Sequence, residues 1–180
     1  ELMYNLAKLK IPTLAVVQGA AYGGALGLIS CCDMAIGADD AQFCLSEVRI
    51  GLAPAVISPF VVQAIGERAA RRYALTAERF SGERARELGL LSESYAADAL
   101  EQQVAHWVDN LLLNSPHAMR ACKDLLREVS HGAPTPAIRR YCENAIARIR
   151  VSPEGQEGLR AFLQKRSPSW QAATPTQEPR

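Results

Sequence analysis

The sequence has almost no excess of charge of either sign, because 20 basic residues face 19 acidic ones in a chain of 180. Proteins that bind nucleic acid usually carry a basic excess or a basic stripe, so this balance argues against nucleic acid as a partner. Long apolar runs are also missing, and none approaches the ~20 residues that cross a bilayer. Residues 1–12 lack the pattern of a secretory signal. We therefore expect a cytoplasmic protein with no membrane partner.

Patterns that ligate metals are scarce as well. The chain has three histidines and five cysteines, with no C-x-x-C pair and no histidine near a cysteine at ligand spacing. We therefore predict no metal site. Cys31 and Cys32 are adjacent and lie among apolar residues, which favours buried, reduced thiols over disulfides.

The residues that are present change in character near residue 65. Before that point, short apolar runs alternate with turn residues, and the order strand, helix, strand indicates an α/β unit with parallel pairing. After it, the pattern predicts one helix after another. We expect strands at 13–17, 34–37 and 41–45, and helices at 2–9, 24–32, 69–75, 81–88, 97–113, 116–129, 136–150 and 153–165.

These patterns predict a core at 1–96, a helical region at 97–170 and a polar, disordered tail at 171–180. The first residues indicate a helix already under way, without a cap. We therefore expect that the sequence begins inside a domain.

Two adjacent glycines, Gly23 and Gly24, follow a predicted buried strand and open an apolar helix. Inside a helix glycine costs about 1 kcal/mol relative to alanine. At a strand-to-helix turn it leaves backbone N–H groups free at a helix N-terminus, where they stabilise negative charge. The spacing does not match the dinucleotide-binding fingerprint. An oxyanion hole and simple tight packing of helix on strand both remain open.

Glu47 stands in the apolar segment AQFCLSEVRIGLAPAVISP. Apolar surroundings disfavour the ionised form of a carboxylate, which suits it to proton transfer. The plainer interpretation is that Glu47 pairs with Arg49 or faces water. The apolar loop at 51–59, which includes Leu52 and Pro54, either lines a pocket or simply connects two elements.

Three stretches, in this order, resemble the crotonase superfamily, the enoyl-CoA hydratases and isomerases. They are PTLAVVQGAAYGGALGLISCCDMAIGADDAQFCLSEVRIGLAP, IGERAARRYALTAERFSGERARELGLLSE and SPEGQEGLRAFLQKRSPSW. The resemblance covers residues 11–170. It implies a spiral of ββα units, incomplete at its start, followed by a carboxyl-terminal helical trimerisation region. It also implies an acyl-CoA substrate, no cofactor apart from the CoA of that substrate, and a homotrimer or a dimer of trimers.

The resemblance also implies roles for single residues. The N–H of Gly24 would be one oxyanion donor, and the other donor would lie upstream of residue 1. Glu47 would be the acid–base residue, whereas Gly27 stands where hydratases have a second glutamate. Lys165 would approach a CoA phosphate, although a solvated helix end is equally open, and core packing is equally open for Tyr22. The substrate-binding residues implied are Tyr22, Gly23, Ala25, Gly27, Leu52, Pro54, Phe162 and Lys165.

The implied reaction is the addition of water across the C2–C3 double bond of an enoyl-CoA, through an enolate that the oxyanion hole stabilises. The segments GLISCCD and AVISPFVV look closest to the branch that hydrates 3-methylglutaconyl-CoA and its isoprenoid relatives, in leucine and terpene degradation. Gly27 cannot transfer a proton, which leaves alternatives open. One is an enoyl-CoA isomerase or a thioester hydrolase of the same fold, and another is a non-catalytic subunit that binds acyl-CoA. Glu47 argues against the last, because a carboxylate is costly to keep in an apolar segment without a role.

Overall fold

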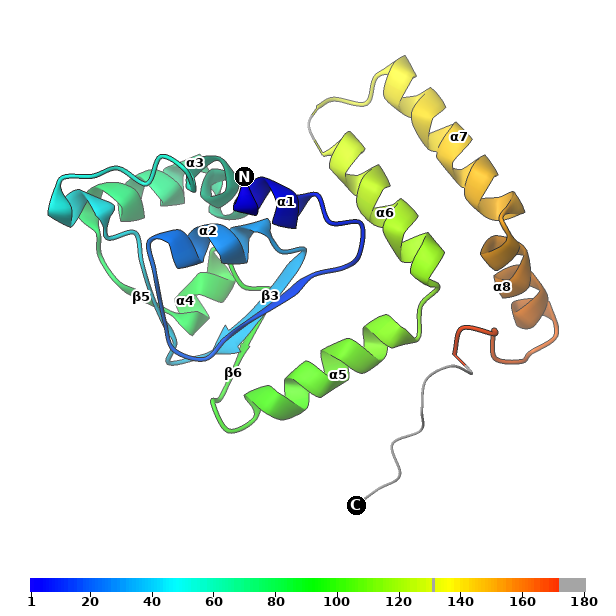
Figure 1. Ribbon diagram of the computed structural model, residues 1–180, viewed down its shortest axis with the longest axis horizontal. Helices are drawn as coiled ribbons and strands as arrows, with labels where there is room; N and C mark the ends of the chain where they lie inside the picture. Colours follow the sequence, from blue (N-terminus) through cyan, green and yellow to red (C-terminus); the bar gives the residue numbers. More distant parts are fainter. Residues whose placement is uncertain (131, 172–180) are drawn as a thin grey trace. The chain divides into compact units, whose positions relative to one another are not determined.

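The computed structural model describes residues 1–130 and 132–171 (Figure 1). The chain divides into two compact units. Unit 1 holds Glu1–Leu9 and Thr13–His106, and unit 2 holds Lys10–Pro12 and the described residues from Trp107 onward. The division falls inside helix α5 (Leu100–Leu112), whereas we expected the core to end at residue 96. The expected tail lies outside the described residues, apart from residue 171.

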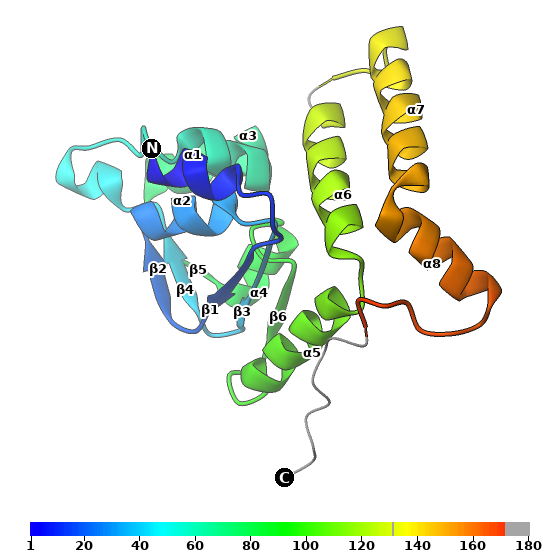
Figure 2. The ribbon, with the colours of Figure 1, turned by 45° about the vertical axis from the view of Figure 1, so that its right-hand side comes forward.

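Unit 1 contains two successive ββα units (Figure 2). The first consists of β1 (Leu14–Val17), β2 (Ala20–Tyr22) and α2 (Gly24–Cys31). The second consists of β3 (Met34–Ala38), β4 (Gln42–Cys44), the short 3-10 helix η1 (Glu47–Ile50) and α3 (Ser58–Thr76). β1 pairs in parallel with β3, and β2 pairs in parallel with β4, so the strands of the second ββα unit lie in register beside those of the first. The α/β class and the spiral of ββα units are thus confirmed.

Two further strands complete the sheets, β5 (Phe80–Ser81) and β6 (Glu93–Tyr95), and helix α4 (Gly82–Glu87) lies between them in the chain. β5 pairs antiparallel with β4, and β6 pairs parallel with β3. The sequence did not predict β2, β5 or β6, because strands of two or three residues are too short to show a hydrophobic period. It also missed the first half of α3, which Gly66 interrupts with a backbone φ of 76°.

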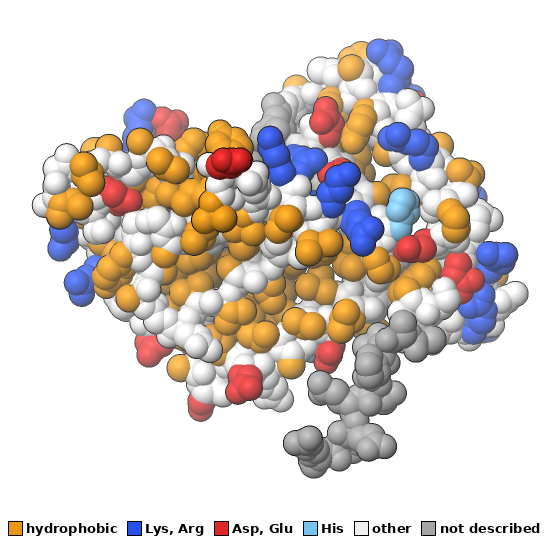
Figure 3. Space-filling model, in the orientation of Figure 1, with side chains coloured by type: hydrophobic (Ala, Val, Ile, Leu, Met, Phe, Trp, Pro, Cys, Tyr) orange, Lys and Arg blue, Asp and Glu red, His pale blue; other side chains and the backbone are white. Residues whose placement is uncertain are grey.

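The core of unit 1 lies between the sheets and their helices. Leu26 on α2, Ile36 on β3 and Phe43 on β4 are fully buried. The Phe43 ring stacks on the Phe80 ring, with 5.4 Å between the ring centroids. Apolar side chains also gather on the surface of unit 1 (Figure 3), and α1 (Leu2–Ala7) contributes exposed ones.

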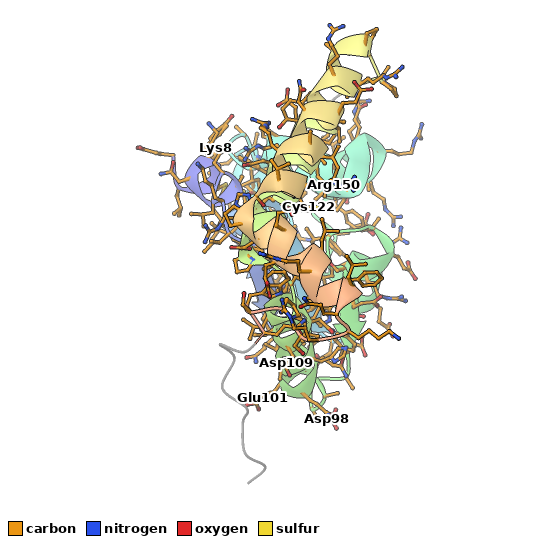
Figure 4. The ribbon with its side chains drawn as sticks, turned by 90° about the vertical axis from the view of Figure 1, so that its right-hand side faces the viewer. Lys8, Asp98, Glu101, Asp109, Cys122 and Arg150 are labelled. Carbon is orange, nitrogen blue, oxygen red and sulfur yellow. The ribbon has the colours of Figure 1, made fainter. Side chains whose placement is uncertain are left out.

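Unit 2 contains three helices that start in the same way: α6 (Pro116–Val129), α7 (Pro136–Val151) and α8 (Pro153–Leu163). Figure 4 labels Cys122 on α6 and Arg150 on α7. Each helix has proline in its first turn and a preceding serine or threonine whose hydroxyl accepts a hydrogen bond from the N–H three residues on. This cap explains why the predicted starts of these helices are correct. Among the described residues, every helix is too short or too polar to span a membrane.

The segment after α8 folds back on that helix through Glu157. The Glu157 carboxylate accepts hydrogen bonds from the Arg166 guanidinium, at 2.6 and 3.0 Å, and from the Ser169 N–H at 3.1 Å. Chiefly because of the Arg166 hydrogen bond, the pKa of Glu157 is lowered to about 2. The Trp170 indole N–H donates to the Leu113 carbonyl, which ties the segment to the residue after α5.

We expect acid to release this segment. Because the pKa of Glu157 is lower in the folded state than the ~4.3 of a free glutamate, its stabilisation is complete above that value. The stabilisation is lost as the pH falls through about 2. Trp170 fluorescence, measured in a Trp107→Phe background, should therefore change over this range. Glu157→Gln should show the released signal already at neutral pH, unlike the control Glu128→Gln, and identical acid titrations of the two variants would contradict the assignment.

Candidate active site

Gly23 forms the turn between β2 and α2. Its backbone has φ 53° and ψ −120°, in the region that glycine adopts without steric cost. Its N–H donates to the Cys44 carbonyl at the end of β4, with 2.9 Å between N and O. The backbone angles therefore explain why this residue is a glycine. The hydrogen bond joins the turn to β4, the strand that leads to Glu47.

Gly24 is a glycine for a different reason. It is the first residue of α2, so its N–H has no carbonyl within the helix to bond. Gly24 is exposed, and a Cβ built on it would meet no atom within 4 Å. Tight packing of helix on strand therefore does not explain this glycine. The open space in front of a free N–H allows a ligand oxygen to approach it.

Glu47 brings a carboxylate to this turn. It begins η1, three residues after the end of β4. A Cβ built on Gly23 would lie 3.3 Å from Glu47 Oε1, so the carboxylate lies against the turn. Glu47 Oε2 is buried and has no hydrogen-bond partner within the described part of the chain. A buried polar atom without a partner is uncommon in native proteins, and a catalytic role is one of the explanations for it.

The proposed alternative, a Glu47–Arg49 ion pair, does not form. Arg49 Nη2 donates instead to the Ala77 carbonyl at 2.8 Å, and Cys44 Sγ donates to the same oxygen at 3.3 Å. The Leu52 N–H donates to the Glu47 carbonyl at 3.0 Å and closes η1. These bonds fix the backbone of Glu47 between β4 and the end of α3.

Gly27, where the resemblance places a second glutamate, is buried in α2. A Cβ on Gly27 would lie 2.3 Å from Ile57 Cγ2 and 2.7 Å from Met3 Cε. These two apolar side chains fill the space that a larger residue would need. The position thus serves packing, and α2 supplies no carboxylate there.

The other predicted site residues fall into two groups. Pro54 lines a cavity along α3, Leu52 is exposed beside it, and Ala25 follows Gly24 in the first turn of α2. The Tyr22 ring lies partly exposed under the Arg79 guanidinium, 5.5 Å from its centroid, and so is not a core side chain.

Phe162 and Lys165 belong to unit 2, at the end of α8 and just after it, so their approach to a bound CoA stays a prediction. Residues 1–130 and 132–171 contain no group of three His, Cys, Asp or Glu side chains that could hold a metal. Cys31 is buried and forms no disulfide. Its pKa is raised to about 11, chiefly by burial, so the side chain stays a protonated thiol.

Comparison with known proteins shows the family to which the chain belongs. Residues 1–173 match the family model described as enoyl-CoA hydratase/isomerase. The chain therefore belongs to this family, within the crotonase superfamily. In the enoyl-CoA hydratase from Shewanella pealeana ATCC 700345, the similar region is 52% identical, with a TM-score of 0.89, and covers 94% of this chain and 63% of that one.

Two further relatives extend the comparison. Pseudomonas aeruginosa AtuE is 41% identical, with a TM-score of 0.89, over 94% of this chain and 66% of that one. The hydroxycinnamoyl-CoA hydratase-lyase of Pseudomonas fluorescens is 36% identical over 113 residues, which are 62% of this chain and 41% of the relative. The chain thus spans less than two thirds of the length of each of these three proteins.

The two turn glycines should respond differently to alanine. Gly23→Ala places a side chain at positive φ and against Glu47 Oε1, which should lower the free energy of unfolding by about 1–3 kcal/mol. Gly24→Ala is the matched control and should leave the free energy of unfolding unchanged or raise it by up to about 1 kcal/mol, because nothing opposes its Cβ and alanine lowers the conformational entropy of the unfolded chain. Urea unfolding of both variants measures this difference, and equal losses would contradict it.

Gly27 and Ile57 should be energetically coupled. Gly27→Ala overpacks the contact with Ile57 and should cost about 1–3 kcal/mol, whereas Ile57→Ala opens a cavity and should cost about 2–5 kcal/mol. In the double variant the added methyl group enters the vacated space, so the combined loss should be smaller than the sum. A double-mutant cycle in urea measures this, and an additive result would show that the two side chains do not compete for space.

Proposed function

We propose that the protein is an enoyl-CoA hydratase in which Glu47 is the acid–base residue and the Gly24 N–H is an oxyanion donor. The observation that carries the proposal is the Glu47 carboxylate, whose Oε1 lies against the Gly23 turn and whose buried Oε2 has no partner among the described residues. Membership of the enoyl-CoA hydratase/isomerase family supports the acyl-CoA substrate.

In the proposed reaction, the thioester oxygen of the substrate accepts a hydrogen bond from Gly24. The Glu47 carboxylate takes a proton from water as the water oxygen forms a bond to C3, and the electrons of the double bond move to the thioester oxygen. Protonated Glu47 then returns the proton to C2 as the enolate collapses. Hydrogen bonds to the developing oxyanion are stronger than those to the ground-state carbonyl, and one such donor contributes about 3–4 kcal/mol.

A second candidate function is an enoyl-CoA isomerase, and the observation that favours it is Gly27. Ile57 and Met3 fill the space beside Gly27, so α2 brings no second carboxylate to Glu47. One carboxylate suffices to move a proton between C4 and C2 of the same substrate, because no water has to be held.

The proposal also includes the acyl group of the substrate, the oligomeric state and the location in the cell. A branched acyl group of the 3-methylglutaconyl type is the proposed substrate. A trimer or a dimer of trimers, tested by sedimentation, and a cytoplasmic location, tested by fractionation of cells, both stay predictions.

The test uses the full-length protein and follows the absorbance of the conjugated enoyl thioester. Hydration of crotonyl-CoA or 3-methylglutaconyl-CoA removes this absorbance, whereas isomerisation of a 3-enoyl-CoA creates it. Glu47→Gln should lower kcat/KM about 100- to 10,000-fold, because it removes the group that carries the proton.

Glu83→Gln, on exposed α4, is the matched control and should keep kcat/KM within about twofold. Turnover that survives in Glu47→Gln would overturn the role of Glu47. Creation of absorbance from a 3-enoyl-CoA, without any hydration, would establish the isomerase instead.

A further inference from the structure

The turn at residues 77–79, between α3 and β5, begins with a residue in an uncommon backbone conformation. Ala77 has φ 49° and ψ 30°, in the left-handed region, and its N–H donates to the Tyr73 carbonyl at 3.0 Å. A residue with a side chain is uncommon in this region, because its Cβ crowds the backbone. Such a conformation persists only where the surrounding contacts fix it. The contacts of Ala77 therefore show what this conformation serves.

The Ala77 carbonyl holds the segment that carries Glu47. Ala77 is fully buried, and its carbonyl accepts hydrogen bonds from Arg49 Nη2 at 2.8 Å and from Cys44 Sγ at 3.3 Å. A carbonyl oxygen has two lone pairs, so these two donors use its full capacity. The bond from Arg49 is the stronger one, because a charged donor makes a hydrogen bond roughly twice as strong as a neutral donor does. Arg49 is thus the main link between η1 and the turn at 77–79.

The same turn also contacts the other half of the candidate active site. The guanidinium of Arg79 lies over the Tyr22 ring, 5.5 Å from its centroid, and Tyr22 directly precedes Gly23. One short segment therefore contacts both the strand that leads to the glycine turn and the 3-10 helix that begins with Glu47. A loss of the bond to η1 would change the position of Glu47 relative to the Gly24 N–H.

The direction of the Arg49 side chain also leaves the Glu47 carboxylate unpaired. An arginine two residues away could form an ion pair with this carboxylate, which would favour its ionised form and make it a weaker base. Arg49 donates to the Ala77 carbonyl instead, and Glu47 Oε2 has no hydrogen-bond partner in the part of the chain that the structure describes. The Ala77 carbonyl thus engages the cation of η1 and keeps it from the carboxylate.

We propose that Arg49 is a positioning residue: through its bond to the Ala77 carbonyl it fixes η1 and holds the Glu47 carboxylate at the Gly23 turn. The effect on catalysis rests on the proposed function, in which Glu47 carries the proton. A displacement of about 1 Å, caused by a mutation away from the reacting atoms, can lower a rate about 100-fold. The bond is therefore expected to affect kcat through the position of Glu47.

Arg49→Met keeps most of the aliphatic stem and removes the donor. It should lower kcat about 10- to 100-fold and leave KM within about threefold, because the Arg49 head group is bonded to Ala77 and makes no contact that binds substrate. Arg49→Lys should restore kcat to within about threefold of the wild type, because a single N–H···O bond needs only one donor of the ammonium group. Arg68→Met, at an exposed arginine of α3, is the matched control and should keep kcat and KM within about twofold.

The experiment measures kcat and KM of the full-length protein with the enoyl-CoA that the wild type turns over fastest. The deciding comparison is made in the Glu47→Gln background. If Arg49 acts through Glu47, Arg49→Met should change the residual kcat of Glu47→Gln by less than about twofold, because no carboxylate remains to be positioned. General damage to the structure would instead lower kcat by the same factor in both backgrounds.

Hydrogen exchange tests the link without any need for turnover. The Leu52 N–H donates to the Glu47 carbonyl at 3.0 Å, so its exchange rate reports whether η1 stays closed. Arg49→Met should raise this rate about tenfold or more, whereas Arg49→Lys and Arg68→Met should not. The Ser92 N–H, which donates to the Ala35 carbonyl at 2.6 Å, is the internal control and should keep its rate.

Three results would overturn the inference: a kcat of Arg49→Met equal to that of Arg68→Met, a loss that Arg49→Lys does not restore, or an equal loss in the Glu47→Gln background. If the wild type turns over no enoyl-CoA, the proposed function fails, and hydrogen exchange decides on the link. Faster exchange of the Leu52 N–H in Arg49→Met would then support it, and an unchanged rate would overturn it. If Arg49→Met does not fold, Arg49→Gln replaces it, with the same expected results, because its side chain is shorter and uncharged.

Discussion

The hydrogen bond from the Gly23 N–H to the Cys44 carbonyl is the constraint on which the site depends. It joins the turn that opens α2 to the end of β4, and these two points are twenty-one residues apart in the chain. Parallel pairing of β2 with β4 brings the two strand ends together, and the positive φ of Gly23 then directs the chain into α2. The free N–H of Gly24 and the carboxylate of Glu47 become neighbours of one turn as a consequence.

Gly23, Gly24 and Gly27 are glycines for three different physical reasons. Gly23 is needed for its backbone angle, Gly27 for the space that Ile57 and Met3 occupy, and Gly24 for neither. A residue that is not required for backbone or packing and that stands in front of open space is best explained by what must approach it. This reasoning separates a ligand-facing glycine from structural ones within five positions of the same helix.

Much of unit 1 and the helices of unit 2 could be predicted from the sequence, because apolar runs, proline starts and hydroxyl caps act locally. The pairing of β5 and β6 could not be predicted, since these strands are short and join partners far along the chain. The same limit applies to the site. The sequence indicated Glu47 and the glycines, but the Arg49 bond to Ala77 and the contact of Ile57 with Gly27 depend on tertiary packing. The sequence offered a pocket-lining role for the loop at 51–59, and Pro54 does line a cavity, but the part of that cavity along α3 was not predicted, because the bend in α3 arises from one glycine inside a helical pattern.

Ile57 links the candidate active site to the cavity along α3. Its side chain occupies the space beside Gly27 and also forms part of the apolar wall along α3. A carboxylate at position 27 would have to displace Ile57, and its charge would then stand next to a cavity lined by hydrocarbon. Such a charge would be poorly solvated there. Glycine at position 27 is therefore compatible with the apolar side chains around it, and the carboxylate at the turn comes from Glu47, on the segment that follows β4.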